Sequence, residues 1–86
     1  MKYWPSFLWL ALGIGTGVQA QTVEESYAAL KQGDYPTAFA GFKGAAENGE
    51  ANSQSTLGMM YAEGWGTPKN ERQAYYWYRQ SAEQGS

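Results

Sequence analysis

The stretch AFAGFKGAAENG at residues 38–49 returns as AYYWYRQSAEQG at residues 74–85, an offset of 36 positions. Alanine, glutamate and glycine recur at equivalent positions, Phe42 becomes Tyr78, and Lys43 becomes Arg79. A period in this range is typical of stacked helical hairpins, in which each unit buries its apolar face against a neighbour. The repeat therefore predicts an all-α fold of the α-solenoid type, and it favours a binding surface over an active site.

Capping signals divide the sequence after residue 20 into four helices. Three short polar residues can accept a hydrogen bond from a first-turn backbone N–H; they are Thr22, Asp34 and Asn70. Glu25 and Gln73 stand three positions after two of these caps, as in a capping box. Three glycines can close helices in a left-handed conformation; they are Gly33, Gly49 and Gly64. The predicted helices run from about 23 to 32, 35 to 48, 51 to 63 and 71 to 84, and no stretch alternates like a strand.

The expected inner faces mix small residues, which let helix backbones approach, with large ones that fill the space between. Val23, Tyr27 and Leu30 fall on one face of the first helix. The expected inner residues of the other helices are Ala38, Gly41, Phe42, Ala45 and Ala46, then Gln54, Leu57, Gly58 and Tyr61, then Ala74, Trp77, Tyr78, Ser81 and Ala82. Gly58 in mid-helix costs about 1 kcal/mol relative to alanine, so we expect a neighbour packed closely against it.

The first twenty residues have the features of a secretory signal peptide. Lys2 is followed by an apolar run at residues 7–17, and the segment ends with Val18-Gln19-Ala20, as at a cleavage site. We expect cleavage between Ala20 and Gln21, and a secreted or periplasmic protein. An uncleaved membrane anchor is the alternative, although the apolar run is shorter than the roughly 20 residues that span a bilayer.

Composition excludes several classes of function. Without Lys2, five basic residues stand against eight acidic ones, which gives a net charge of −3 and no basic cluster for nucleic acid. Membrane contact is expected only transiently, through the signal peptide. The chain has no histidine or cysteine, no Gly-x-Ser-x-Gly turn and no metal-ligand spacing. We therefore expect no catalytic residue, no cofactor and no metal, and a hydrolase is the least favoured class.

The second half of the chain resembles a Sel1-like repeat, a relative of the tetratricopeptide repeats. The matching residues are Ala51, Leu57, Gly58, Met60, Tyr61, Gly64, Trp65, Gly66, Asn70, Ala74, Trp77, Tyr78, Ala82 and Gly85. Residues 27–38 are similar to a tetratricopeptide hairpin. The resemblance implies a tetratricopeptide-like hairpin at 21–49 and a Sel1-like repeat at 50–86, after the signal peptide expected at 1–20.

The resemblance also implies a non-catalytic module that binds a protein or peptide on the curved face of the array. The candidate partner-binding residues on the third helix are Asn52, Ser55, Thr56, Met59 and Glu63. Trp65 in the loop either anchors a partner or folds back over the hairpin. Tyr75 and Tyr76 are further candidates, because aromatic residues with a polar tip are common interface anchors.

Two hairpins are fewer than the roughly three repeats that such arrays usually need. Three interpretations fit this length: a truncated gene, a homo-oligomer formed end to end, or a chain that docks on a partner's helices. The alternative function is accordingly a subunit or regulator that completes the helical stack of an envelope enzyme or secretion complex.

Overall fold

The computed structural model describes residues 21–85, which form four helices. They are α2 (Val23–Lys31), α3 (Tyr35–Glu47), α4 (Ala51–Glu63) and α5 (Glu71–Glu83). The predicted all-α class is confirmed, and the four helices have nearly the expected bounds. None of the helices within residues 21–85 has the length and apolarity needed to span a membrane. The predicted signal peptide lies outside the described residues.

The predicted helix caps are present. Thr22 Oγ1 accepts from the Glu25 backbone N–H at 3.0 Å, and Glu25 Oε1 accepts from the Thr22 N–H at 3.0 Å, which completes a capping box. Asp34 and Asn70 each accept a first-turn N–H in the same way. The cap of α4 was not predicted. It is Glu50, whose Oε1 accepts a hydrogen bond from the backbone N–H of Ser53 at 2.7 Å.

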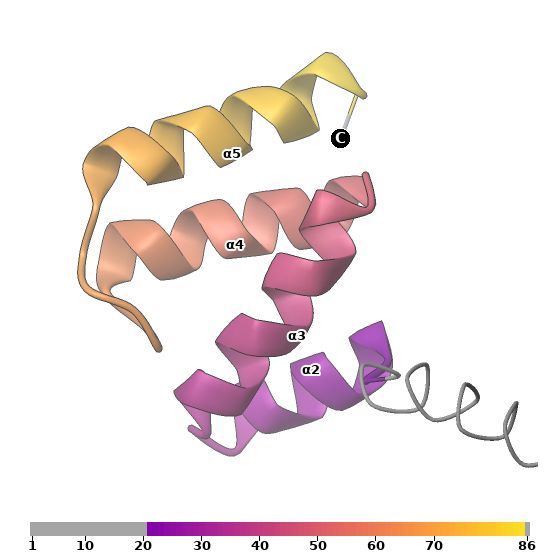
Figure 1. Ribbon diagram of the computed structural model, residues 1–86, viewed down its shortest axis with the longest axis vertical. Helices are drawn as coiled ribbons and strands as arrows, with labels where there is room; N and C mark the ends of the chain where they lie inside the picture. The colour runs from indigo at the N-terminus through magenta and orange to yellow at the C-terminus, as the bar shows by residue number, and fades with distance from the viewer. Residues whose placement is uncertain (1–20, 86) are drawn as a thin grey trace, which may run out of the picture.

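The helices form two hairpins, α2–α3 and α4–α5, joined by packing of α3 against α4 (Figure 1). In Figure 1, α3 crosses from α2 to the α4–α5 pair, and α5 lies along α4 on the side away from α2. Each hairpin turn brings consecutive helices together, as expected for a helical-repeat stack. Among the described helices, α5 therefore forms one end of the stack.

The core lies where α2, α3 and α4 meet. Ala29, Ala38, Phe42 and Met60 form one buried cluster. Phe42, Leu57 and Met60 are fully buried. Burial of each such large side chain contributes about 1.5–3 kcal/mol. A domain of this size has few such side chains, so each of them matters to the folded state.

Close approach of α2 and α3 depends on Gly41. A Cβ atom at Gly41 would overlap Ser26 Oγ and the Gln21 side chain. Ser26 is fully buried, and its hydroxyl donates to Thr22 O at 3.1 Å while it accepts from Gln21 Nε2 at 3.1 Å. Because Gly41 has no Cβ, the Ser26 hydroxyl and the Gln21 amide can pack against the backbone of α3 at this position.

Two other glycines make equivalent contacts in the second hairpin. A Cβ at Gly58 would lie 2.9 Å from Cδ1 of Tyr78, so the predicted close neighbour of Gly58 is the Tyr78 ring. Gly66 has φ of 79°, and a Cβ there would overlap Tyr35 O and lie 2.8 Å from Phe39 Cβ. The loop between α4 and α5 thus rests on the backbone of α3 at Gly66, where both conformation and space require glycine.

A network of glutamine side chains joins α3, α4 and α5. Gln54 Nε2 donates to Ala46 O at 3.2 Å, in a buried position. Gln84 Nε2 donates to Gln54 Oε1 at 2.7 Å and to Gly49 O at 3.0 Å. Ser81 Oγ donates to a backbone carbonyl of α4 at 3.0 Å. These bonds reach carbonyl groups at the end of α3, in the turn after it and at the start of α4, and thereby tie the three helices together.

Three of the expected inner residues are exposed: Tyr27, by 40%, and Tyr78, by 42%, and Ala82 of α5. The buried line of α5 passes through Ala74 and Ser81 instead. Tyr78 and Ala82 lie beside this line, and the Tyr78 ring packs on Gly58 of α4 while the rest of its surface stays exposed.

Candidate functional site

One candidate surface lies where the Tyr27 side chain of α2 reaches α4. Tyr27 projects from α2 with 40% of its surface exposed, and its hydroxyl lies 3.4 Å from Thr56 Oγ1 on α4. The inner side of the Tyr27 ring meets the Phe42 ring edge-on, with centroids 4.8 Å apart. The ring is therefore fixed from below while its other side faces solvent, an arrangement suited to an aromatic anchor.

Asn52, Met59 and Glu63 share a face of α4 with Thr56 by helical spacing, and the predicted residues of α4 differ in exposure. Asn52 and Glu63 are exposed, and Ser55 and Met59 are half-buried. The expectation that Thr56 is exposed is wrong: Thr56 is 7% exposed. Its hydroxyl is directed back to Asn52 O at 3.0 Å, and Tyr27 of α2 lies over it. We name Tyr27, Ser55, Met59 and Glu63 the α2–α4 surface.

Tyr27 was not among the sequence candidates, because its spacing placed it on the inner face of the first helix. Its phenol group could have indicated a position at the border of the core, because a buried tyrosine needs a hydrogen-bond partner for its hydroxyl. The structure places the ring at the border, where the edge contacts the core and the hydroxyl reaches the next hairpin.

Trp65 folds back over the hairpin. Its ring stacks on Tyr35 of α3, with centroids 5.3 Å apart and an interplanar angle of 11°. The ring is half-buried and packs against the core cluster, while Phe39 and Tyr61 make an edge contact nearby at 5.4 Å. The sequence left open whether Trp65 anchors a partner or folds back over the hairpin, and in the structure its indole packs on the hairpin.

Tyr75 and Tyr76 of α5 are both exposed, by 64% and 49%. Tyr76 meets Trp77 edge-on with centroids 4.9 Å apart. The two tyrosines point to different sides of α5, because consecutive helical residues are about 100° apart. They do not join the α2–α4 surface, so the sequence candidates belong to separate surfaces.

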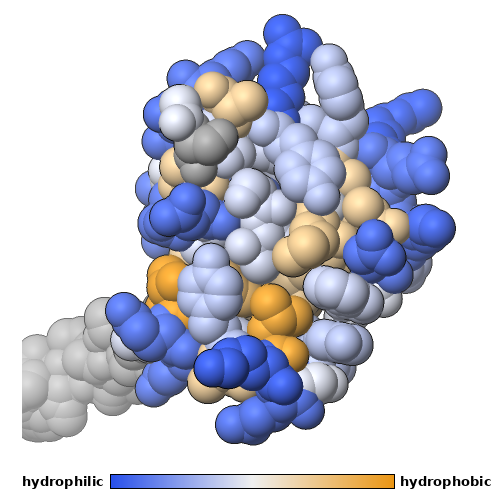
Figure 2. Space-filling view, turned by 180° about the vertical axis from the view of Figure 1, so that it is seen from behind, coloured by the Kyte–Doolittle hydropathy of each residue, from blue (hydrophilic) through white to orange (hydrophobic). Residues whose placement is uncertain are grey.

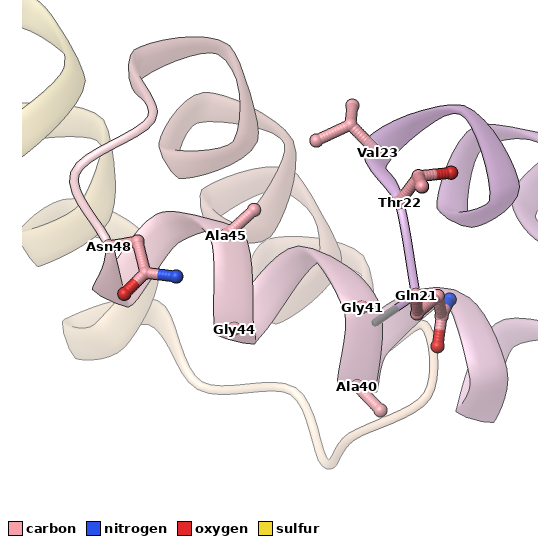
Figure 3. Close-up of a pocket in the computed structure, with 8 residues that line it drawn as sticks. All are labelled: Gln21, Thr22, Val23, Ala40, Gly41, Gly44, Ala45 and Asn48. Carbon is pink, nitrogen blue, oxygen red and sulfur yellow. The ribbon is translucent and has the colours of Figure 1, made fainter. Parts of the chain in front are cut away.

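A groove of about 500 Å³ lies between the start of α2 and the outer side of α3 (Figure 3). Gln21, Thr22 and Val23 form one wall. The other wall consists of small or short residues of α3, which are Ala40, Gly41, Gly44, Ala45 and Asn48. The lining carries no charged side chain, and Gln21 Nε2 is already bonded to Ser26 Oγ and Thr37 O. The groove has room for apolar or backbone groups and offers no acid or base.

Charge is distributed unevenly over the described helices. α2, α4 and the cap of α4 carry four glutamates, Glu24, Glu25, Glu50 and Glu63, against Lys31. α5 carries Glu71, Arg72, Arg79 and Glu83, which sum to zero. The net negative charge of residues 21–85 thus lies on the α2 and α4 side. Figure 2 shows that the rear face of the molecule is mainly hydrophilic, with small hydrophobic areas.

Two exposed ion pairs recur at equivalent positions of α3 and α5. Lys43 Nζ donates to Glu47 at 2.7 Å, and this bond and the attraction of the charges raise the pKa of Lys43 above its ordinary value of 10.5. Arg79 Nε donates to Glu83 at 3.2 Å, and this bond, followed by the nearby Tyr75, raises the pKa of Arg79. Both pairs are ordinary exposed contacts one helical turn apart, and water screens their charges. Neither marks a catalytic group.

Residues 21–85 contain no group of three or more acidic, histidine or cysteine side chains that could hold a metal ion. The features described above are exposed aromatic and polar side chains on a stack of helical hairpins. They define the class of helical-repeat proteins, whose surfaces serve for binding.

Comparison with known families agrees with this class. Residues 51–86 match the family described as Sel1 repeat, so this part of the chain is a Sel1 repeat, and the resemblance noted in the sequence is confirmed. Sel1 repeats are helical repeats related to the tetratricopeptide type, are typically non-catalytic and generally mediate protein interactions. No match was found among curated proteins or among solved structures.

Proposed function

We propose that this chain is an exported, non-catalytic interaction module that binds a protein or peptide partner through the α2–α4 surface. The observation that carries the proposal is the Tyr27 ring, which is held by Phe42 on one side and is open to solvent on the other. Met59 and Glu63 lie along the face of α4 that contains Thr56 and would add apolar contact and charge to a partner's binding. A pre-positioned aromatic residue loses little conformational freedom on binding, which favours affinity.

Export rests on the sequence of the first twenty residues. Lys2, the apolar run at residues 7–17 and Val18-Gln19-Ala20 are the features of a cleaved signal peptide, with Ala20 and Gln21 flanking the cleavage site. The test is the mass of the protein recovered from cells that express the complete sequence. A species beginning at Gln21 in the exported fraction supports the proposal, and a full-length species held in the membrane contradicts it.

The binding test compares variants of matched chemistry in an affinity isolation from an envelope extract. We expect the parent protein to retain a defined partner, and Tyr27→Gln and Glu63→Lys to lose it. Glu71→Lys makes the same charge change on α5 and should retain the partner. Thermal melts of each variant confirm that the fold is intact. Equal retention by all four proteins, or none above background, would refute the assignment of this surface.

A second candidate function follows from α5. Its exposed Tyr75 and Tyr76 favour a subunit that completes the helical stack of an envelope enzyme or secretion complex. In that case Tyr75→Glu would abolish partner retention, and Tyr27→Gln would leave it unchanged.

A further inference from the structure

The side chain of Gln21 joins the two helices of the first hairpin. Its amide nitrogen Nε2 donates to Ser26 Oγ of α2 at 3.1 Å and to Thr37 O of α3 at 3.1 Å. A carboxamide has two N–H donors, so both are used. A Cβ at Gly41 would overlap Nε2 and lie 2.8 Å from Cδ of Gln21, and Figure 3 shows the two residues side by side. The carboxamide of Gln21 therefore rests on the backbone of α3.

The main chain directly after Gln21 is fixed as well. Thr22 forms the capping box of α2 with Glu25. Thr22 O also accepts from the backbone N–H of Ser26 at 3.0 Å and from its hydroxyl at 3.1 Å. Gln21 is thus held at two places, because its main chain leads into the cap of α2 while its carboxamide is bonded to α3.

Cleavage before Gln21 would give this residue a new chemical property. The freed α-amino nitrogen and the carboxamide carbon Cδ belong to the same residue, so their reaction is intramolecular. The nitrogen attacks Cδ and forms an N–Cδ bond, and the Cδ–Nε2 bond breaks. Nε2 leaves as ammonia with a proton taken from the α-amino group. The product is the five-membered lactam pyroglutamate, and the step needs no oxidant and no other reactant.

We propose that Gln21, once it is the N-terminal residue, is a modification site at which the folded domain opposes cyclisation to pyroglutamate. The inference rests on the proposed cleavage between Ala20 and Gln21. Ring closure requires Nε2 to take up a proton and leave, and Nε2 must first release its acceptors on α2 and α3. The groove that Gln21 borders has no charged side chain in its lining that could deliver this proton.

Cyclisation in the folded protein must accordingly pass through a local opening at Gln21. Such openings involve small parts of a structure and do not require global unfolding. When opening and closing are fast compared with the reaction, the rate follows the population of the open form. Substitutions that weaken the bonds of Gln21 to α2 and α3 should therefore accelerate cyclisation, and substitutions elsewhere should not.

The modification also acts back on the fold. Pyroglutamate lacks Nε2, so neither Ser26 Oγ nor Thr37 O can accept from it. Ser26 is fully buried, and its hydroxyl loses one of its two partners. A buried polar group that loses a partner destabilises the folded state. The cyclised protein should therefore melt at a lower temperature than the protein with an intact Gln21.

The experiment follows the loss of ammonia by mass spectrometry in the exported protein recovered from cells that express the complete sequence. A synthetic peptide of residues 21–26 in the same buffer gives the rate without the fold. We expect the folded protein to cyclise about tenfold or more slowly than the peptide, because two hydrogen bonds must open. A fully cyclised sample, prepared with glutaminyl cyclase, should have a lower Tm than the untreated protein.

Matched variants assign the protection to the described contacts. Ser26→Ala removes an acceptor of Nε2 and should cyclise faster than the parent, whereas Ser55→Ala makes the same change on α4 and should not. Gln54→Leu, which weakens the contact of α3 with α4, controls for a general loss of stability. All rates are measured where circular dichroism shows each variant to be folded.

The possible failures are distinguishable. An exported protein that begins at neither Gln21 nor its cyclised form overturns the proposed cleavage and this inference together. A protein that begins at Gln21 overturns this inference alone if it cyclises as fast as the peptide or is recovered fully cyclised. An unchanged rate in Ser26→Ala, or an equal acceleration in Gln54→Leu, overturns the assignment to the contacts of Gln21. A cyclised sample with an unchanged or higher Tm contradicts the effect on the fold.

Discussion

Alanine substitutions at Gly41 and Gly44 should shift stability in opposite directions. Both glycines lie inside α3, three residues apart, and both should gain from alanine's higher helix propensity, by about 0.5–1 kcal/mol. Gly44 is exposed, and a Cβ there meets no atom within 4 Å. Gly44→Ala should therefore realise this gain in full, raising Tm by about 4 °C for a domain of this size.

Gly41→Ala should destabilise. The new methyl group would overlap Ser26 Oγ, and Ser26 is fully buried and cannot turn outward. Overpacking of this kind typically costs about 1–3 kcal/mol. Displacing the hydroxyl also disturbs its bonds to Thr22 O and Gln21 Nε2, each worth about 1 kcal/mol. After the propensity gain is subtracted, about 1–3 kcal/mol of net loss remains, so Tm should fall by roughly 5–15 °C.

The assay is thermal and urea unfolding followed by far-UV circular dichroism, with the double variant Ser26→Ala/Gly41→Ala as a third protein. Removing the Ser26 hydroxyl removes the closest overlap and releases the Gln21 side chain, which can then move away from the new methyl group. The double variant should therefore be more stable than the sum of the two single changes predicts. The reasoning is refuted if the Tm of Gly41→Ala is equal to or higher than the Tm of Gly44→Ala. It is also refuted if the stability change of the double variant equals the sum of the changes caused by Ser26→Ala and Gly41→Ala.

The remaining predictions concern the second hairpin and one surface ion pair. Gly58→Leu should lower stability by at least about 2 kcal/mol, because its side chain must displace the Tyr78 ring; truncating Tyr78 in the same chain should recover part of the loss, as seen in melts. Gln54→Leu should cost about 1–3 kcal/mol, because buried carbonyl and amide partners lose their bonds, and amide exchange should increase at the end of α5. Lys43→Met should cost no more than about 0.5 kcal/mol at low salt. Because Glu47 raises the pKa of Lys43, that small contribution is present below pH 10.5 and is lost as pH rises through the raised value, where parent and variant melts should converge.

The helix boundaries could be predicted because they depend on neighbours in sequence. Thr22, Asp34 and Asn70 act through a backbone N–H of their own first turn, which sequence spacing describes directly. The cap at Glu50 escaped prediction, since glutamate is not among the preferred capping residues. Its longer side chain reaches the same N–H, and only coordinates reveal that it bends back.

Side-chain exposure was predicted less well, because it depends on helices that lie far apart in the sequence. Helical spacing groups Thr56 with Asn52 and Met59, but Tyr27 of α2 covers Thr56 alone. Tyr78 shows the opposite error. Its place in the repeat implies burial, and burial requires a following hairpin that the described residues do not include.

The two occurrences of the repeated motif separate what is local from what a neighbour supplies. The ion pairs made by Lys43 and Arg79 are the same in α3 and α5, since each forms within one turn of its own helix. The aromatic positions differ: Phe39 and Phe42, which meet α4, are replaced at the end of the stack by Tyr75 and Tyr78. The added hydroxyl lowers the cost of exposure to water while the ring keeps its contact area. The repeated motif thus keeps the contacts that each helix makes within itself and changes the aromatic residues where the neighbouring helices differ.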